Sequence, residues 1–246
     1  IVVRAPWKQG TNGMEPTASY APLYTLIHAM AHRDNSSKIP TPPTVEARLL
    51  QGPDHAPVII AWRTAGMNGD AIHGVLPLPE ATAKIRACDA LGNRVAVLHS
   101  RDESRISIGE LPVVIEGFTT EVVCMMASLA VVPERLNASV RVHDHQLELR
   151  NTMHESMNGH LILRPIDGVS IRPSIIGLSL SPGETMTRDI EIVVTTPLPD
   201  GQIPLELEAR LDSGRRLPMT TWLETGMSQL DVVWSRRTEN GNDDLV

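Results

Sequence analysis

Residues 184–211 alternate between apolar and polar side chains on both sides of a turn signal, and this pattern limits the possible folds more than any other. A strand that alternates in this way buries one face and exposes the other. Its apolar face needs a second sheet to cover it, so the pattern predicts a hairpin of two half-buried strands inside a β-sandwich. Glu206, Glu208 and Arg210 are expected to face solvent. The residues expected in the core are Met186, Ile190, Ile192 and Val194 before the turn, and Leu205, Leu207, Ala209 and Leu211 after it.

Short apolar runs separated by turn residues occupy most of the remaining chain. In residues 44–117 these runs lie about ten residues apart, a spacing typical of a β-sandwich or a related barrel. Residues 131–234, which contain the hairpin, form the second expected β-sandwich. The strands expected in the first unit are 45–50, 58–62, 72–76, 84–88, 95–98, 106–108 and 113–115.

Residues 1–34 differ from these units. Their sequence predicts a strand at 1–7, a loop at 8–13 and then a helix at 19–33. In the helix, Leu23, Leu26, Ile27 and Met30 recur at the spacing of one buried stripe. The fold class is therefore mainly β, with two consecutive antiparallel β-sandwich units after one N-terminal strand and helix. The other expected segments are a Pro- and Ser-rich linker at 35–43, a connecting segment at 118–130 that could cross as a strand, and a flexible polar tail at 235–246.

Composition excludes several classes of protein. The formal net charge of −7 argues against a nucleic-acid partner, and no apolar run is long enough for a membrane span. Two cysteines, Cys88 and Cys124, are too few for a metal cluster or a disulfide framework, so we expect inert core or free thiols and no metal or cofactor. The sequence begins at Ile1 without a signal-peptide pattern, which indicates a processed product or a piece of a longer polypeptide.

The segment His143-Asp144-His145 contains metal-ligand residue types at close range. The apolar alternation changes phase here, because Val140 and Val142 are out of step with Leu147 and Leu149. A bulge or tight turn would explain the change. We therefore favour a solvated turn over a metal site.

Other candidate residues also have simpler explanations. Glu116 has the residue type of a catalytic acid, but its place at the end of a predicted strand favours a structural role. No G-x-S-x-G sequence and no phosphate-binding Gly-rich loop is present, so the serine hydrolase and nucleotide-binding classes have no support. Asn35 and Asn137 match the glycosylation sequon, which matters only in a glycosylating secretory pathway.

The order of these elements resembles the C-terminal end of clan-A-type glycoside hydrolases. The residues that carry the resemblance are Arg4-Ala5-Pro6-Trp7, Val58-Ile59-Ile60-Ala61-Trp62, Cys88-Asp89-Ala90-Leu91-Gly92-Asn93 and Leu111-Pro112-Val113-Val114-Ile115-Glu116-Gly117. The second unit looks like the immunoglobulin-like accessory domains, sometimes called NEW3, of secreted sugar enzymes. Its matching residues are 147–151, 158–159 and 178–184.

This resemblance implies that residues 1–34 correspond to the last strand and helix of a (β/α) barrel. The two catalytic carboxylates of such a barrel stand on its fourth and seventh strands, which would lie upstream of Ile1, so no catalytic residue is expected in this chain. By the same resemblance Trp7 lies where such barrels place a substrate-binding ring under the sugar. The alternative is a Trp7 ring wedged between the barrel remnant and the sandwich.

The leading hypothesis is a non-catalytic accessory portion of a secreted or cell-surface glycoside-hydrolase-like protein, which braces and spaces an upstream catalytic barrel. A polysaccharide and a second copy of the chain are further candidate partners. One alternative is a structural or adhesive cell-surface protein that assembles through its β-sandwiches. A weaker alternative is a carbohydrate-binding module, against which the 3% aromatic content argues.

Overall fold

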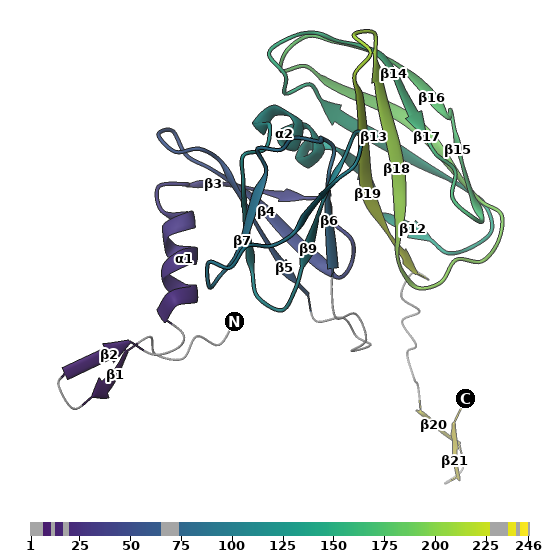
Figure 1. Ribbon diagram of the computed structural model, residues 1–246. Helices are drawn as coiled ribbons and strands as arrows, with labels where there is room; N and C mark the ends of the chain where they lie inside the picture. Colours follow the sequence, from purple (N-terminus) through teal and green to yellow (C-terminus); the bar gives the residue numbers. More distant parts are fainter. Residues whose placement is uncertain are drawn as a thin grey trace.

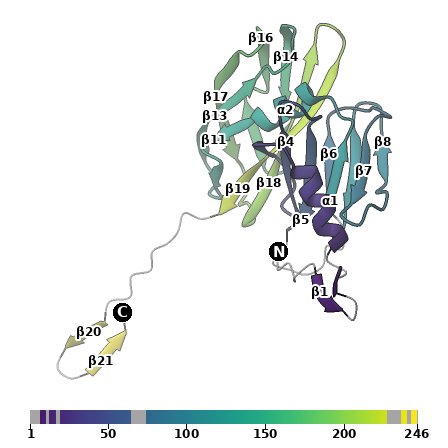
Figure 2. The same cartoon turned by 90° about the vertical axis from the view of Figure 1, so that its left-hand side faces the viewer.

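The computed structural model describes residues 7–10, 13–16, 20–64, 74–226, 236–239 and 242–245. Antiparallel strands dominate this part of the chain, as Figures 1 and 2 show, so the expected mainly-β fold class is confirmed. The strands gather into two units, and each unit has its own apolar core. Neither of the two helices in the described residues is long and apolar enough to cross a membrane.

The first unit packs a five-stranded sheet, in the order β3-β4-β5-β10-β7, against a three-stranded sheet, in the order β6-β9-β8. Alternate residues of the larger sheet face opposite sides: Ile59 and Ala61 enter the core between the sheets, whereas Val58 and Ile60 meet helix α1 (Tyr20–Met30). The expectation that Ile27 and Met30 are buried is wrong, because α1 meets the sheet through the face that carries Leu26 and Ala29. The strands are β3 (Asn35–Ile39), β4 (Val45–Gln51), β5 (Val58–Arg63), β6 (Gly74–Leu78), β7 (Arg86–Asp89), β8 (Val97–His99), β9 (Ser104–Ile108) and β10 (Val113–Glu116).

The second unit is a sandwich of a four-stranded sheet, β11-β13-β17-β15, and a five-stranded sheet, β12-β19-β18-β14-β16. Its core residues alternate along the strands, as expected for two sheets that each bury one face. The strands are β11 (Ala130–Val132), β12 (Arg135–Asn137), β13 (Val142–Arg150), β14 (Met157–Leu163), β15 (Val169–Arg172), β16 (Ile175–Leu180), β17 (Thr185–Val194), β18 (Gly201–Leu211) and β19 (Arg216–Gly226).

The two strands of the expected hairpin at 184–211 do not pair. Strand β17 pairs with β13 and β15, whereas β18 pairs with β19 and β14 in the opposite sheet. The expected core residues before the turn, and all but Leu211 after it, are buried as predicted, because the period of two fixes which face is apolar. It does not fix the partner strand, and the proline-containing loop at 195–200 carries the chain across the sandwich instead of folding it back.

Three connecting segments also differ from expectation. Part of the expected linker, Asn35–Ile39, is the edge strand β3, which pairs with β4. Residues Thr120–Ser128, where we considered a crossing strand, form helix α2. The segment around His143 contains neither a bulge nor a turn, because β13 pairs with β17 in unbroken register from Val142 to Arg150.

The chain ends also contain short hairpins. Strands β1 (Trp7–Gly10) and β2 (Gly13–Pro16) pair where a loop was expected. In the tail, β20 (Arg236–Glu239) pairs with β21 (Asn242–Leu245), although the sequence shows no apolar period there. Residues 1–6 of the expected strand at 1–7, the start of the strand at 72–76 and the apolar run at 230–234 lie outside the described residues.

Helix α2 lies between the two units in both views (Figures 1 and 2). Val122 and Met125 belong to the core of the second unit, whereas Val123 and Met126 belong to the core of the first. All four side chains are buried, so the helix is apolar on two faces instead of one. This shared helix holds the units side by side and leaves the outer faces of two sheets opposite each other.

Candidate functional site

A cleft of about 640 Å³ separates the outer face of β6-β9-β8 in the first unit from the outer face of β18 and β19 in the second. Met126 of helix α2 lines it, so the cleft lies beside the segment that joins the units. Small-molecule sites in proteins have volumes in this range and often lie between domains. The cleft is therefore the candidate functional site.

The wall from the first unit is mainly apolar. Its outward residues on β6 and β9, Val75, Pro77 and Arg105, alternate with core residues of the same strands. Val75 is 43% exposed and Leu98, on β8, is 68% exposed. These side chains face the cleft instead of a packed interface, so the wall offers apolar surface to a ligand.

The wall from the second unit contains a tryptophan, Trp222. Trp222 on β19 lies directly opposite Pro204 on β18, and Thr220 lies opposite Glu206. Trp222 is half-buried, and within the described residues its indole N–H has no hydrogen-bond partner. The indole face, together with the Glu206 carboxylate and the Thr220 hydroxyl beside it, can bind a flat molecule that carries hydroxyl groups.

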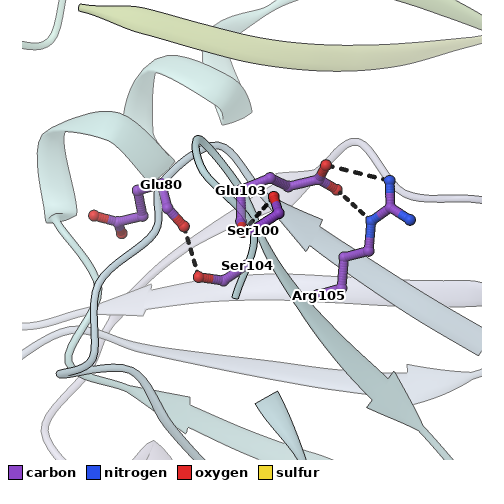
Figure 3. A network of polar contacts seen from close by, with 5 residues as sticks. All are labelled: Glu80, Ser100, Glu103, Ser104 and Arg105. Carbon is purple, nitrogen blue, oxygen red and sulfur yellow. Dashed lines mark hydrogen bonds and ion pairs between the residues drawn. The ribbon is translucent and has the colours of Figure 1, made fainter. Parts of the chain in front are cut away.

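The turn between β8 and β9 is held firmly against the rest of the first unit (Figure 3). The Ser104 hydroxyl donates to the backbone oxygen of Glu80 at 2.6 Å, and the Ser100 hydroxyl donates to that of Glu103 at 3.1 Å. Arg105 donates through two nitrogens to the two carboxylate oxygens of Glu103, at 3.0 and 3.3 Å. The Glu80 carboxylate in turn accepts from the backbone N–H of Thr119 at 2.6 Å, at the start of α2. The turn is thus tied to the shared helix.

Glu208 lies at the same end of the cleft, and the expectation that it faces solvent is wrong. Its side chain points to the outer face of β18, as the alternation requires, but that face is covered and Glu208 is 5% exposed. One carboxylate oxygen accepts from Arg210 at 2.6 Å, and the other accepts from Arg164. The hydrogen bond from Arg210, together with that from Arg164, holds the pKa of Glu208 below its usual range. Glu206 and Arg210 are exposed as expected.

The structure places His143 and His145 on the core side of β13, not in a solvated turn. His145 donates through Nδ1 to the backbone oxygen of Pro133 at 2.9 Å, and His143 donates through Nε2 to that of Ser139 at 3.2 Å. The centroids of the two imidazole rings are 6.5 Å apart. Burial lowers the pKa of His145. Both histidines continue the buried face of the strand, which explains the change of phase in the sequence.

The other candidate residues do not gather at the cleft. Glu116 is exposed at the end of β10, opposite Arg86. Cys88 and Cys124 are both free, and burial raises the pKa of each thiol. Within the described side chains, no three His, Cys, Asp or Glu residues are grouped as metal ligands. The backbone of Trp7 belongs to β1, but its side chain lies outside the described residues, so its proposed role in substrate binding stays a prediction.

Comparison with known proteins gives a weak likeness of fold. No family model and no curated protein matches the chain. A Bacteroides uniformis β-glucuronidase structure matches 69% of this chain and 26% of that chain, with a TM-score of 0.29 and 10% identity. Bacteroides uniformis β-glucuronidase 2, covalently bound to cyclophellitol-6-carboxylate aziridine, matches 80% of this chain and 27% of that chain, with a TM-score of 0.28 and 10% identity. The chain thus spans about a quarter of the length of these enzymes, and the likeness carries no conclusion about activity.

Proposed function

We propose that the chain is a non-catalytic accessory portion of a secreted or cell-surface glycoside-hydrolase-like protein, and that it braces and spaces a catalytic barrel that lies upstream. Helix α2 is the observation that carries this proposal, because Val123 and Met126 enter one core while Val122 and Met125 enter the other. A connection of this kind fixes the angle between two units far better than a flexible linker does. A fixed angle is what a brace requires.

The outward face of helix α1 supports an attachment to a further body. Leu26 and Ala29 pack on the five-stranded sheet, whereas Tyr24, Ile27 and Met30 are 59%, 56% and 55% exposed. Large apolar side chains grouped on one helix face are typical of a surface that another body covers. In the proposed protein this body is the rest of the barrel, to which residues 1–34 would contribute the last strand and helix.

Two measurements test this proposal. The intact mass of the protein purified from its source is expected to exceed 26.9 kDa by the mass of a barrel. In that longer protein, Ile27→Glu is expected to lower the melting temperature of the barrel, whereas in the isolated chain the same change should have little effect. Glycoside hydrolysis by the isolated chain, abolished by changing one of its own carboxylates, would refute the proposal.

The same helix face also distinguishes the structural or adhesive alternative. If copies of the chain assemble through Tyr24, Ile27 and Met30, the isolated chain should sediment as an oligomer, and Ile27→Glu should make it monomeric. A monomeric isolated chain that binds the barrel in trans would favour the accessory function. The carbohydrate-binding alternative would instead rest on Trp222 in the cleft, and Trp222→Ala would then abolish retention on immobilised polysaccharide.

A further inference from the structure

A second hollow, of about 310 Å³, continues the cleft at its charged end. The turn between β8 and β9 lines one side of it with Arg101 and Asp102, and the second unit lines the other side with Arg164, Glu208 and Arg216. Both units therefore contribute charged side chains to one small space. The accessory function proposed above makes no use of this hollow, and the inference below does not depend on it.

Positive charge is in excess here, although the whole chain has a formal net charge of −7. Two of the three nearby carboxylates are already occupied: Glu103 accepts from Arg105, and Glu208 accepts from both Arg164 and Arg210. The third carboxylate is Asp102. The lining of the hollow holds three arginines, Arg101, Arg164 and Arg216, against these three carboxylates. The excess of two positive charges comes from Arg105 and Arg210, which lie outside the lining and pair with Glu103 and Glu208 at its edge.

The position of Arg216 makes this excess costly. Arg216 on β19 lies directly opposite Arg210 on β18, and like charges at directly opposite positions destabilise a strand pair. Arg210 is compensated by Glu208, whose two oxygens are both in use. Within the described residues Arg216 has no ion-pair partner, and neither has Arg101 across the hollow. The positive charge of Arg216 in the β18–β19 pair is therefore not compensated by a carboxylate of the described residues.

We propose that this hollow binds a phosphate- or sulfate-like oxyanion between Arg101 of the first unit and Arg216 of the second. Guanidinium groups match such anions because their N–H donors lie in a planar fork that meets two oxygens at once. The bound anion would compensate Arg216 and would join the two units by a charge bridge. The Asp102 carboxylate repels an anion, so the proposal predicts that removing its charge strengthens binding.

Isothermal titration calorimetry of the full chain with sodium phosphate, at ionic strength held constant with sodium chloride, tests the site. Saturable binding is expected, and Arg101→Gln and Arg216→Gln should each weaken it by about tenfold or more. Asp102→Asn should strengthen it, because the change removes the opposing charge. Arg188→Gln is the matched control, since Arg188 is exposed on the distant strand β17 and donates only to a backbone oxygen. All four substituted side chains are partly or fully exposed, so each variant is expected to fold.

The source of the oxyanion is distinguished by titration with glucose 6-phosphate and with glucose. Binding of glucose 6-phosphate that depends on Arg216, without binding of glucose, would identify a phosphate ester as an acceptable ligand. Binding of inorganic phosphate alone would identify the free ion, and either result supports the site. The proposal is overturned if no saturable binding occurs, or if Arg188→Gln weakens binding as much as Arg216→Gln does.

Discussion

Glu208 and Glu206 lie two residues apart on the same face of β18, and their surroundings differ sharply. Glu208 is buried under two arginines, whereas Glu206 is exposed and within the described residues makes no ion pair. Glu208→Ala is therefore expected to lower the free energy of unfolding by about 1–2 kcal/mol, and Glu206→Ala by less than about 0.5 kcal/mol. The cost at Glu208 is moderate because Arg164 and Arg210 are half-exposed and can be hydrated again.

Urea unfolding at pH 7 measures this contrast. Because the pKa of Glu208 is lowered in the folded state, its contribution is present above the carboxyl's unfolded pKa of about 4.3 and is lost as the pH falls through the folded value. The wild type and Glu208→Ala should therefore converge in stability in strong acid. Equal midpoints for the two alanine variants at pH 7 would contradict the buried position of Glu208.

His145 should make the stability of the second unit depend on pH. Its pKa is lowered by burial, so below the unfolded value of about 6.5 the unfolded chain takes up the proton first. Stability should therefore fall as the pH is lowered from about 6.5 towards the folded pKa of His145, and this contribution should level off below that value. Urea midpoints from pH 8 to pH 5 should show a shallower slope in His145→Gln than in the wild type.

His160 provides the control for this experiment, because it is exposed on β14. His160→Gln should leave the slope unchanged. A slope that is reduced equally in both variants would assign the effect to general charge and not to burial of the imidazole.

At the scale of the elements, two glycines on neighbouring strands are expected to differ sharply in how much a substitution by alanine destabilises the fold. Gly159 on β14 has φ +144°, and a Cβ there would lie 2.1 Å from the backbone oxygen of Arg210. Gly177 on β16, which pairs with β14, has open space around it. Gly159→Ala should lower the free energy of unfolding by more than about 2 kcal/mol, and Gly177→Ala by less than about 1 kcal/mol. Thermal unfolding followed by circular dichroism measures both, and similar melting temperatures would show that β14 can shift away from β18.

Helix α2 gives a further prediction because its methionines are buried, whereas Met30 of helix α1 is more than half exposed. Met126→Ala should lower the free energy of unfolding by about 2–5 kcal/mol, since it leaves a cavity in the first core. Met30→Ala should cost less than about 0.5 kcal/mol in the isolated chain. Chemical denaturation measures the difference. A large loss at Met30 would mean that the outward face of α1 is already covered.

The elements also show what can be predicted from the sequence and where prediction stops. Periodicity predicted most strands and their buried faces, because the side-chain period of a strand is a local property. It did not predict that β17 and β18 belong to opposite sheets, since partner choice depends on long-range contacts. The two histidines of β13 read as polar residues and suggested a turn, although hydrogen bonds to Pro133 and Ser139 allow them to be buried.

The candidate site was harder to predict than the fold for the same reason. The cleft brings together outward residues of β6, β9, β18 and β19, which are far apart in the sequence and which alternation alone marks as solvent-exposed. Only the burial of Glu208 between the units shows that this outer face is covered. One signal was available: Trp222 is out of phase with the core residues of its own strand.

At the scale of the whole molecule, the shared helix predicts that the two units unfold together. A single calorimetric transition is expected, with equal calorimetric and van't Hoff enthalpies. Replacing Val123 with Asp should separate the transition into two, because it charges the side of α2 that faces the first core and leaves Val122 and Met125 in the second. Two transitions in the wild type would show that α2 does not couple the units.

Helix α2 also decides where this chain can be cut. A truncation that ends at residue 117 would strip Val123 and Met126 from the first core, and one that starts at residue 131 would strip Val122 and Met125 from the second. Neither sandwich thus keeps a complete core without α2. In gene fusion or recombination the portable piece is the pair together with its helix, so a homologue that carries one sandwich alone must have rebuilt the surface that α2 covers here.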